Sequence, residues 1–180
     1  MHFANRYEAG RKLAETMMRY SDASAVCGLA RGGVPVAFEI AQARNLVLDV
    51  VVVRKLGAPN NPEFAVGAIA EDNVRVLDED ALGARGLRAE DLAQAEKRER
   101  AVLEARVENY EAGSRVDPAA AHKTIILVDD GLATGATMEA AIACVRARSR
   151  PEQLVVAVPI ASVSAARRIE PRADERSEER

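Results

Sequence analysis

The chain has 180 residues, enough for one domain with a substantial apolar core. Its 25 Lys and Arg against 28 Asp and Glu give a formal net charge of −3, and only 3% of its residues are aromatic. This composition argues against a nucleic-acid binder, because it offers neither a basic excess nor a platform of stacking rings. We find no signal-peptide pattern and no apolar run of about 18 residues, so we expect a cytoplasmic protein without a membrane partner.

The first third of the chain alternates between helical and strand-like patterns. Helical spacing of apolar residues marks the helices, and continuous β-branched runs mark strands buried on both faces of a parallel sheet. The patterns predict a helix, a strand, a helix and a second strand over residues 6–20, 25–29, 34–41 and 46–53. Cys27 and Cys144 both lie in apolar stretches, which favours buried thiols over a disulfide or a zinc site.

The middle of the chain carries three further patterns. Prolines, asparagines and a glycine predict a long loop over residues 54–62. Two short β-like runs, 65–70 and 74–77, predict a small hairpin appended to the sheet. Residues 87–113 predict a long surface helix with one apolar face, and we interpret its charged face as solvated.

The last third adds a third and a fourth buried strand, with a turn and a helix between them. These elements are predicted over residues 124–130, 131–137, 138–148 and 154–160. The alternation predicts an α/β fold of three layers, in which helices flank a mostly parallel sheet. Residues 170–180 are mostly Arg, Asp, Glu and Ser, so we predict a domain over 1–169 and a flexible charged tail over 170–180.

The strongest chemical signal runs from Ile125 to Thr137. An apolar strand delivers Asp129 and Asp130 to the edge of the sheet, and small residues then turn the chain into a helix. Backbone N–H groups in such a turn, with the helix N-terminus, form a site for an anion. The two carboxylates would repel a phosphate, so they suit hydroxyl groups or the shell of a magnesium ion. The motif therefore predicts a ligand with a phosphate near a vicinal diol, as in ribose 5-phosphate.

This stretch resembles the signature for 5-phosphoribosyl-1-pyrophosphate (PRPP) in the type I phosphoribosyltransferase family. The Arg31-Gly32-Gly33 turn and the segment 54–71 resemble an uncharacterised bacterial branch of that family, and together the likeness covers about residues 3–160. It implies a transferase that uses PRPP and Mg²⁺ to transfer a 5-phosphoribosyl group to a nitrogenous acceptor, with release of pyrophosphate. It also implies a homodimer, and it names neither the acceptor nor a general base.

The resemblance assigns roles to three groups of residues. Asp129 and Asp130 would hold the ribose hydroxyls, and they are the best candidates for catalytic residues, with Mg²⁺ carried by PRPP and bridged to them through water. The 5′-phosphate would bind at Gly131, Ala133, Thr134, Gly135, Ala136 and Thr137. The pyrophosphate would bind at Ala30, Arg31, Gly32, Gly33, Arg54 and Lys55, with a cis or strained peptide bond before Arg31 and a mobile flap over 57–64.

Other interpretations of these residues stay open. The acidic pair could cap the following helix or bind magnesium alone, the Arg31-Gly32-Gly33 segment could be an ordinary tight turn, and Arg54-Lys55 could be a solvated pair. Relatives continue past the fourth buried strand, so we expect part of the hood over the acceptor to be missing. The alternative functions are a regulatory module that binds PRPP or a nucleotide without turnover, and a phosphatase or binder of sugar phosphates.

Overall fold

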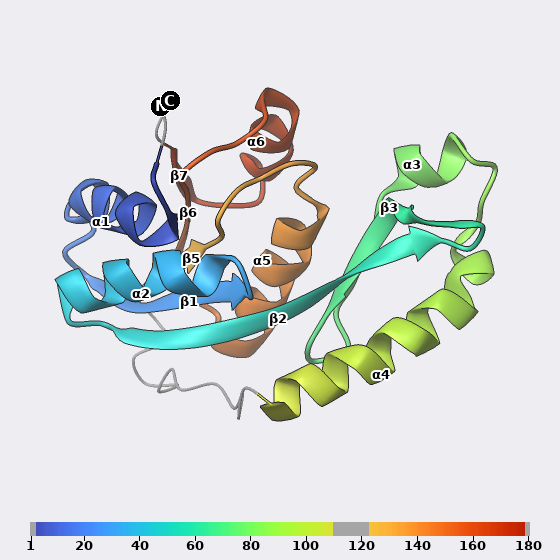
Figure 1. Cartoon of the computed structure of the whole chain (residues 1–180), viewed down its shortest axis with the longest axis horizontal. Coiled ribbons are helices and arrows are strands. Elements are labelled where there is room, and N and C mark those ends of the chain that lie inside the picture. Colours follow the sequence, from blue (N-terminus) through green and yellow to red (C-terminus); the bar gives the residue numbers. More distant parts are fainter. Residues whose placement is uncertain (1–2, 110–122, 179–180) are drawn as a thin grey trace.

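The computed structural model describes residues 3–109 and 123–178, and Figure 1 shows their arrangement. Helical segments are α1 (Arg6–Met17), α2 (Gly33–Arg44), α3 (Glu79–Gly83), the 3-10 turn η1 (Ala89–Leu92), α4 (Ala93–Asn109), α5 (Ala136–Ser149) and α6 (Val163–Ile169). Strands are β1 (Ala23–Ala30), β2 (Val47–Ala58), β3 (Asn61–Ala70), β4 (Arg75–Leu77), β5 (Thr124–Val128), β6 (Gln153–Val158) and β7 (Glu175–Glu178). Within the described part of the chain, no helix combines the length and the apolar character needed to cross a membrane.

The strands form one seven-stranded sheet in the order β4-β3-β2-β1-β5-β6-β7. The five strands from β2 to β7 in this order run parallel, and β3 and β4 are antiparallel to their neighbours. Strands β1, β2 and β5 therefore end at the same edge of the sheet. The predicted α/β architecture with a mostly parallel sheet flanked by helices is confirmed.

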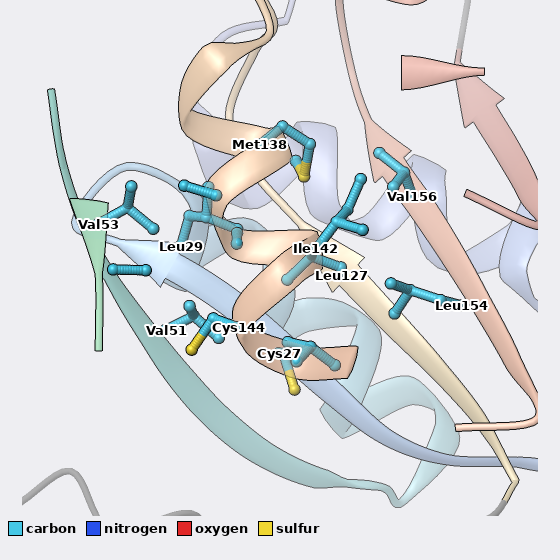
Figure 2. Close-up of a cluster of buried hydrophobic side chains, with 14 of the residues drawn as sticks. Cys27, Leu29, Val51, Val53, Leu127, Met138, Ile142, Cys144, Leu154 and Val156 are labelled. Atoms are coloured by element: carbon cyan, nitrogen blue, oxygen red, sulfur yellow. The ribbon is translucent and has the colours of Figure 1, made fainter. Parts of the chain in front are cut away.

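Helices cover both faces of the parallel sheet because its strands are apolar on both sides. Along β5, Ile125 and Leu127 face α5 and α6, whereas Ile126 and Val128 face α1 and α2. Figure 2 shows the layer beneath α5, in which both cysteines lie among aliphatic side chains. The prediction of buried thiols is confirmed, and burial raises the pKa of Cys144 to about 12.

The β2–β3 hairpin corrects the predicted loop over 54–62. Strand β2 pairs with β1 as far as Val52, continues to Ala58 and pairs there with β3. The composition of 54–62 is typical of a loop, and it does not reveal that β3 is available as a partner. That pairing makes this half of β2 a strand after its pairing with β1 has ended. The predicted hairpin over 65–70 and 74–77 is confirmed by the pairing of β3 with β4, and Asp72 and Asn73 make its turn with positive φ angles of 53° and 62°.

The predicted long helix is confirmed in the main. It begins as η1 and continues as α4, which lies along β2 and forms a lobe with β3 and α3 on the right of Figure 1. Its own residues Leu92, Ala95 and Leu103 are buried, as the predicted apolar face requires, but Val102 is 40% exposed. The end of the predicted helix, 110–113, lies outside the described residues.

The C-terminal segment differs from the predicted charged tail. Residues Glu175–Glu178 form β7 and pair in parallel with β6. The Asp174 carboxylate accepts a hydrogen bond from the Leu154 N–H at 2.7 Å just before that strand. An edge strand is held by backbone hydrogen bonds and tolerates charged side chains, so composition did not reveal it.

Candidate functional site

The turn after β1 and the acidic pair after β5 are pressed together at the edge where these strands end. A Cβ atom added to Gly32 would lie 2.5 Å from Cγ of Asp130, and one added to Gly33 would lie 2.8 Å from Cα of Asp129. A Cβ on Gly33 would meet backbone, so that position requires glycine, whereas a Cβ on Gly32 would displace the Asp130 carboxylate. The Ala30–Arg31 peptide bond is cis, in agreement with the expectation from the resemblance, and the Arg31 side chain is exposed.

The two carboxylates of the acidic pair have different surroundings. Burial raises the pKa of Asp129 to about 7, and the charge of Asp130 acts in the same direction. The Asp130 N–H donates a hydrogen bond to Oδ1 of Asp129 at 2.8 Å, which partly offsets that rise. Asp130 is more open, with 32% of its side chain exposed. The pair therefore presents two hydrogen-bond acceptors at the sheet edge, one of which exchanges its proton near neutral pH.

Arg6 is a site residue that the sequence did not reveal. Its Nε and Nη2 atoms lie 2.7 and 2.6 Å from Oδ2 of Asp130, and its charge lowers the pKa of Asp129. Arg6 begins α1, so this contact brings the N-terminal helix to the acidic pair. Nothing distinguishes Arg6 from the other surface cations of its predicted helix, and its partner lies 124 positions further along the chain.

The loop after the acidic pair is anchored on the side opposite β1. The Leu132 N–H donates to the Ile160 carbonyl at 3.0 Å, and the Ser162 hydroxyl donates to the Ala133 carbonyl at 2.8 Å. Gly135 is the N-cap of α5 with a φ of +85°, and it has no side chain with which to cap the helix. The first N–H groups of α5 therefore remain for an anion, beside exposed Thr134.

Arg54 and Lys55 of β2, which were predicted to bind pyrophosphate, lie at the same edge of the sheet. They differ in whether an ion pair already holds the side chain. A cavity of about 430 Å³ is lined by Ala30, Lys55 and Thr137, among others, so it joins the β1 turn to the end of the 131–137 loop. Lys55 is exposed toward solvent. Arg54 lines the same cavity but is held by Glu99 of α4, with Nη2 and Oε2 only 2.5 Å apart.

Comparisons with known proteins agree with this geometry. The family model described as "Phosphoribosyl transferase domain" matches residues 4–177. The chain belongs to the phosphoribosyltransferase family.

Two individual proteins resemble this chain at high identity. The first is similar in sequence, and the second is similar in both sequence and structure. Rv0571c of Mycobacterium tuberculosis, provisionally named a phosphoribosyl transferase, is 45% identical over 159 residues, which are 88% of this chain. They make up 35% of that protein, so the chain spans about a third of the curated relatives it matches. The crystal structure of TT1426 from Thermus thermophilus is similar with a TM-score of 0.75 and 46% identity, over 99% of this chain and 84% of that one.

A purine phosphoribosyltransferase from Pyrococcus horikoshii shares the fold at much lower identity. Its structure aligns with a TM-score of 0.55 and 15% identity over 99% of this chain and 86% of that one. The phosphoribosyltransferase fold is thus shared even where few residues are.

An ion network centred on the buried carboxylate of Glu139 lies directly behind the 131–137 loop of this phosphoribosyltransferase domain. The Glu139 side chain in the first turn of α5 is 1% exposed and lies 2.5 Å from Nη2 of Arg168 and 2.6 Å from Nε of Arg172. Arg168 also donates to Asp78, the N-cap of α3, and its Cδ would lie 3.2 Å from a Cβ on Gly135. Arg168 thereby joins the loop to the lobe of α3. Sequence reasoning missed it because it placed no helix at 163–169.

Proposed function

We propose that the chain is a phosphoribosyltransferase that uses PRPP and Mg²⁺ to transfer a 5-phosphoribosyl group to a nitrogenous acceptor and releases pyrophosphate. The observation that supports this most directly is the close approach of Gly32 to Asp130. It joins the turn assigned to pyrophosphate to the pair assigned to ribose, and the chain runs on from that pair, which follows β5, into the loop assigned to the 5′-phosphate. A single PRPP molecule presents its three parts in this order.

In this proposal each part of PRPP meets groups of matching chemistry. The ribose hydroxyls donate hydrogen bonds to Asp129 and Asp130, and the contact with Arg6 uses only Oδ2 of Asp130. The 5′-phosphate accepts hydrogen bonds from backbone N–H groups of Gly131 and of residues 133–137, where the N-terminus of α5 favours negative charge. The pyrophosphate lies at the turn over 30–33 and near Lys55, whose positive charge stabilises the leaving group.

The donor set fits a magnesium ion that arrives with the substrate. Among residues 3–109 and 123–178, no cluster of three or more His, Cys, Asp or Glu side chains could hold a metal ion. Mg²⁺ commonly keeps several waters and binds through one or two carboxylates together with substrate phosphates. Asp129 and Asp130 would hold its water shell, and the ion would neutralise the departing pyrophosphate.

A second cavity beside Asp130 suits the acceptor. It measures about 580 Å³, and its walls include Phe3, Tyr7, Pro159 and Ile160. We propose that a nitrogen of an acceptor bound there attacks C1 of the ribose. The C1–N bond forms as the bond from C1 to the pyrophosphate oxygen breaks, through a transition state with oxocarbenium character. The N-terminal segment would then supply a wall of the hood that we expected to be incomplete.

We further propose that the protein acts in the cytoplasm as a homodimer without a nucleic-acid partner. Sedimentation of the purified chain tests the dimer.

Calorimetric titration with PRPP and Mg²⁺ tests the binding part of the proposal. The native chain should bind, the Asp129→Asn/Asp130→Asn double variant should lose binding, and an exposed control, Asp80→Asn, should keep it. No binding by the native chain would contradict the proposal. Release of pyrophosphate is then assayed with purine, pyrimidine and other nitrogenous acceptors. Binding of PRPP without release of pyrophosphate for any acceptor would favour the regulatory module instead.

A further inference from the structure

The face of α4 that packs on the β2–β3 hairpin brings an arginine to the PRPP site. Ala95 and Leu103 are buried on that face, and Glu99 reaches Arg54 from it. Arg98 follows Ala95 by three positions, so the two lie side by side on the helix surface. Arg98 lines the 430 Å³ cavity that also reaches Ala30 and Thr137. We predicted a solvated charged face for this helix, and at Arg98 that face opens on the cavity.

The charged side chains around this cavity differ in whether they form ion pairs. Arg54 and Glu99 satisfy each other through contacts of 2.5 and 2.8 Å, with only 26% and 27% of their side chains exposed. Lys55 and Arg98 are exposed, and neither forms an ion pair with any residue over 3–109 or 123–178. Glu63 is the remaining carboxylate in the cavity wall. Within the described part of the chain, two cations are therefore available to an anion here, and Arg54 is not one of them.

The position of these two cations fits one part of PRPP. Ala30 begins the turn assigned to pyrophosphate, and Thr137 closes the loop assigned to the 5′-phosphate. Lys55 and Arg98 line the same cavity from two other elements, β2 and α4. A diphosphate that extends from the turn into this cavity would therefore meet positive charge from both.

We propose that Arg98 binds the pyrophosphate group of PRPP together with Lys55, and that Arg54 acts as a positioning residue. This inference rests on the proposed function. The guanidinium of Arg98 presents a planar fork of donors that matches two phosphate oxygens. The Arg54–Glu99 pair fastens α4 to β2 one position away, so it holds Arg98 at the cavity. Arg54, which the resemblance placed on the pyrophosphate, thus acts through Glu99.

Titrations with three ligands test Arg98, each with Mg²⁺ on the intact chain: PRPP, inorganic pyrophosphate and ribose 5-phosphate. For Arg98→Gln we expect the Kd values of PRPP and pyrophosphate to rise about ten-fold or more, since a charge-assisted hydrogen bond is lost. Ribose 5-phosphate should bind as before, because it lacks the group that Arg98 contacts. Arg98→Lys should recover part of the loss, since it keeps the charge without the fork.

Lys97→Gln is the matched control, because Lys97 is an exposed cation on the same turn of α4 and lines none of the cavities described above. Its three Kd values should stay within roughly two-fold of the native values. The inference is overturned if Arg98→Gln behaves like Lys97→Gln, or if it weakens all three ligands equally. Failure of the native chain to bind PRPP would instead refute the proposed function, and the pyrophosphate titration still tests Arg98 in that case.

Discussion

Replacing Asp129 by Asn should stabilise the protein at alkaline pH while it weakens the ribose contact, because an amide accepts hydrogen bonds less strongly than a carboxylate. Burial raises the pKa of this carboxyl from the ordinary 3.8 to about 7. Asn keeps the Oδ1 atom that accepts the hydrogen bond from the Asp130 N–H, and it carries no charge at any pH. The substitution therefore isolates the cost of ionising this partly buried carboxyl.

The sign and size follow from proton linkage. Between pH 5 and pH 8 the carboxyl is ionised in the unfolded chain throughout, whereas the folded chain releases its proton near pH 7. The folded state binds more protons in this window, so the free energy of unfolding falls as the pH rises. With one pKa unit worth about 1.4 kcal/mol, the native chain loses about 2–3 kcal/mol through this group between pH 5 and pH 8.

Urea unfolding of the native chain and of Asp129→Asn at both pH values measures the effect. The advantage of the variant over the native chain should grow by about 2–3 kcal/mol from pH 5 to pH 8. Glu15→Gln, at an exposed carboxylate of α1, is the control and should show no such growth. An advantage of equal size at both pH values would refute the reasoning.

Three further substitutions probe the geometry of the site. Gly135→Ala places a side chain at a φ of +85° and should lower the free energy of unfolding by about 1–2 kcal/mol, as measured by thermal or urea unfolding. An unchanged free energy of unfolding would contradict this. Gly32→Ala drives a Cβ to 2.5 Å from the neighbouring carboxylate carbon, so PRPP affinity measured by calorimetry should fall about ten-fold or more. Gly83→Ala, with nothing within 4 Å, is its control, and equal affinities in the two variants would count against the close approach. Arg6→Gln removes a charge that lowers the pKa of Asp129, so an NMR titration of that carboxyl should give a value above about 7, and a fall would be the opposite of what the structure requires.

The pH dependence of ligand binding follows from the same carboxyl. Contact with ribose hydroxyls favours an ionised Asp129, so the affinity for PRPP should weaken as the pH falls below about 7. Calorimetry from pH 6 to pH 8 measures this, with Asp129→Asn as the comparison. An affinity that is constant over this range in the native chain would contradict the role given to Asp129.

Much of the fold was predictable from the sequence because its signals are local. The buried strands are continuous apolar runs, and the acidic pair and the 131–137 loop are adjacent in the chain. Two segments were not predicted because the signal that makes them strands is not local. Residues 54–58 and 175–178 lack a strand-like composition, and they become strands only because β3 and β6 offer them backbone partners.

The sequence by itself determined the parallel α/β core and the run from Ile125 to Thr137, because neighbouring residues carry those patterns. Tertiary structure alone decided which distant side chains join that run: Arg6 from α1, Arg98 from α4 and Arg168 from α6. It also decided the state of Asp129, whose pKa is raised to about 7 because the packed chain removes water from the carboxyl and because the charge of Asp130 lies beside it.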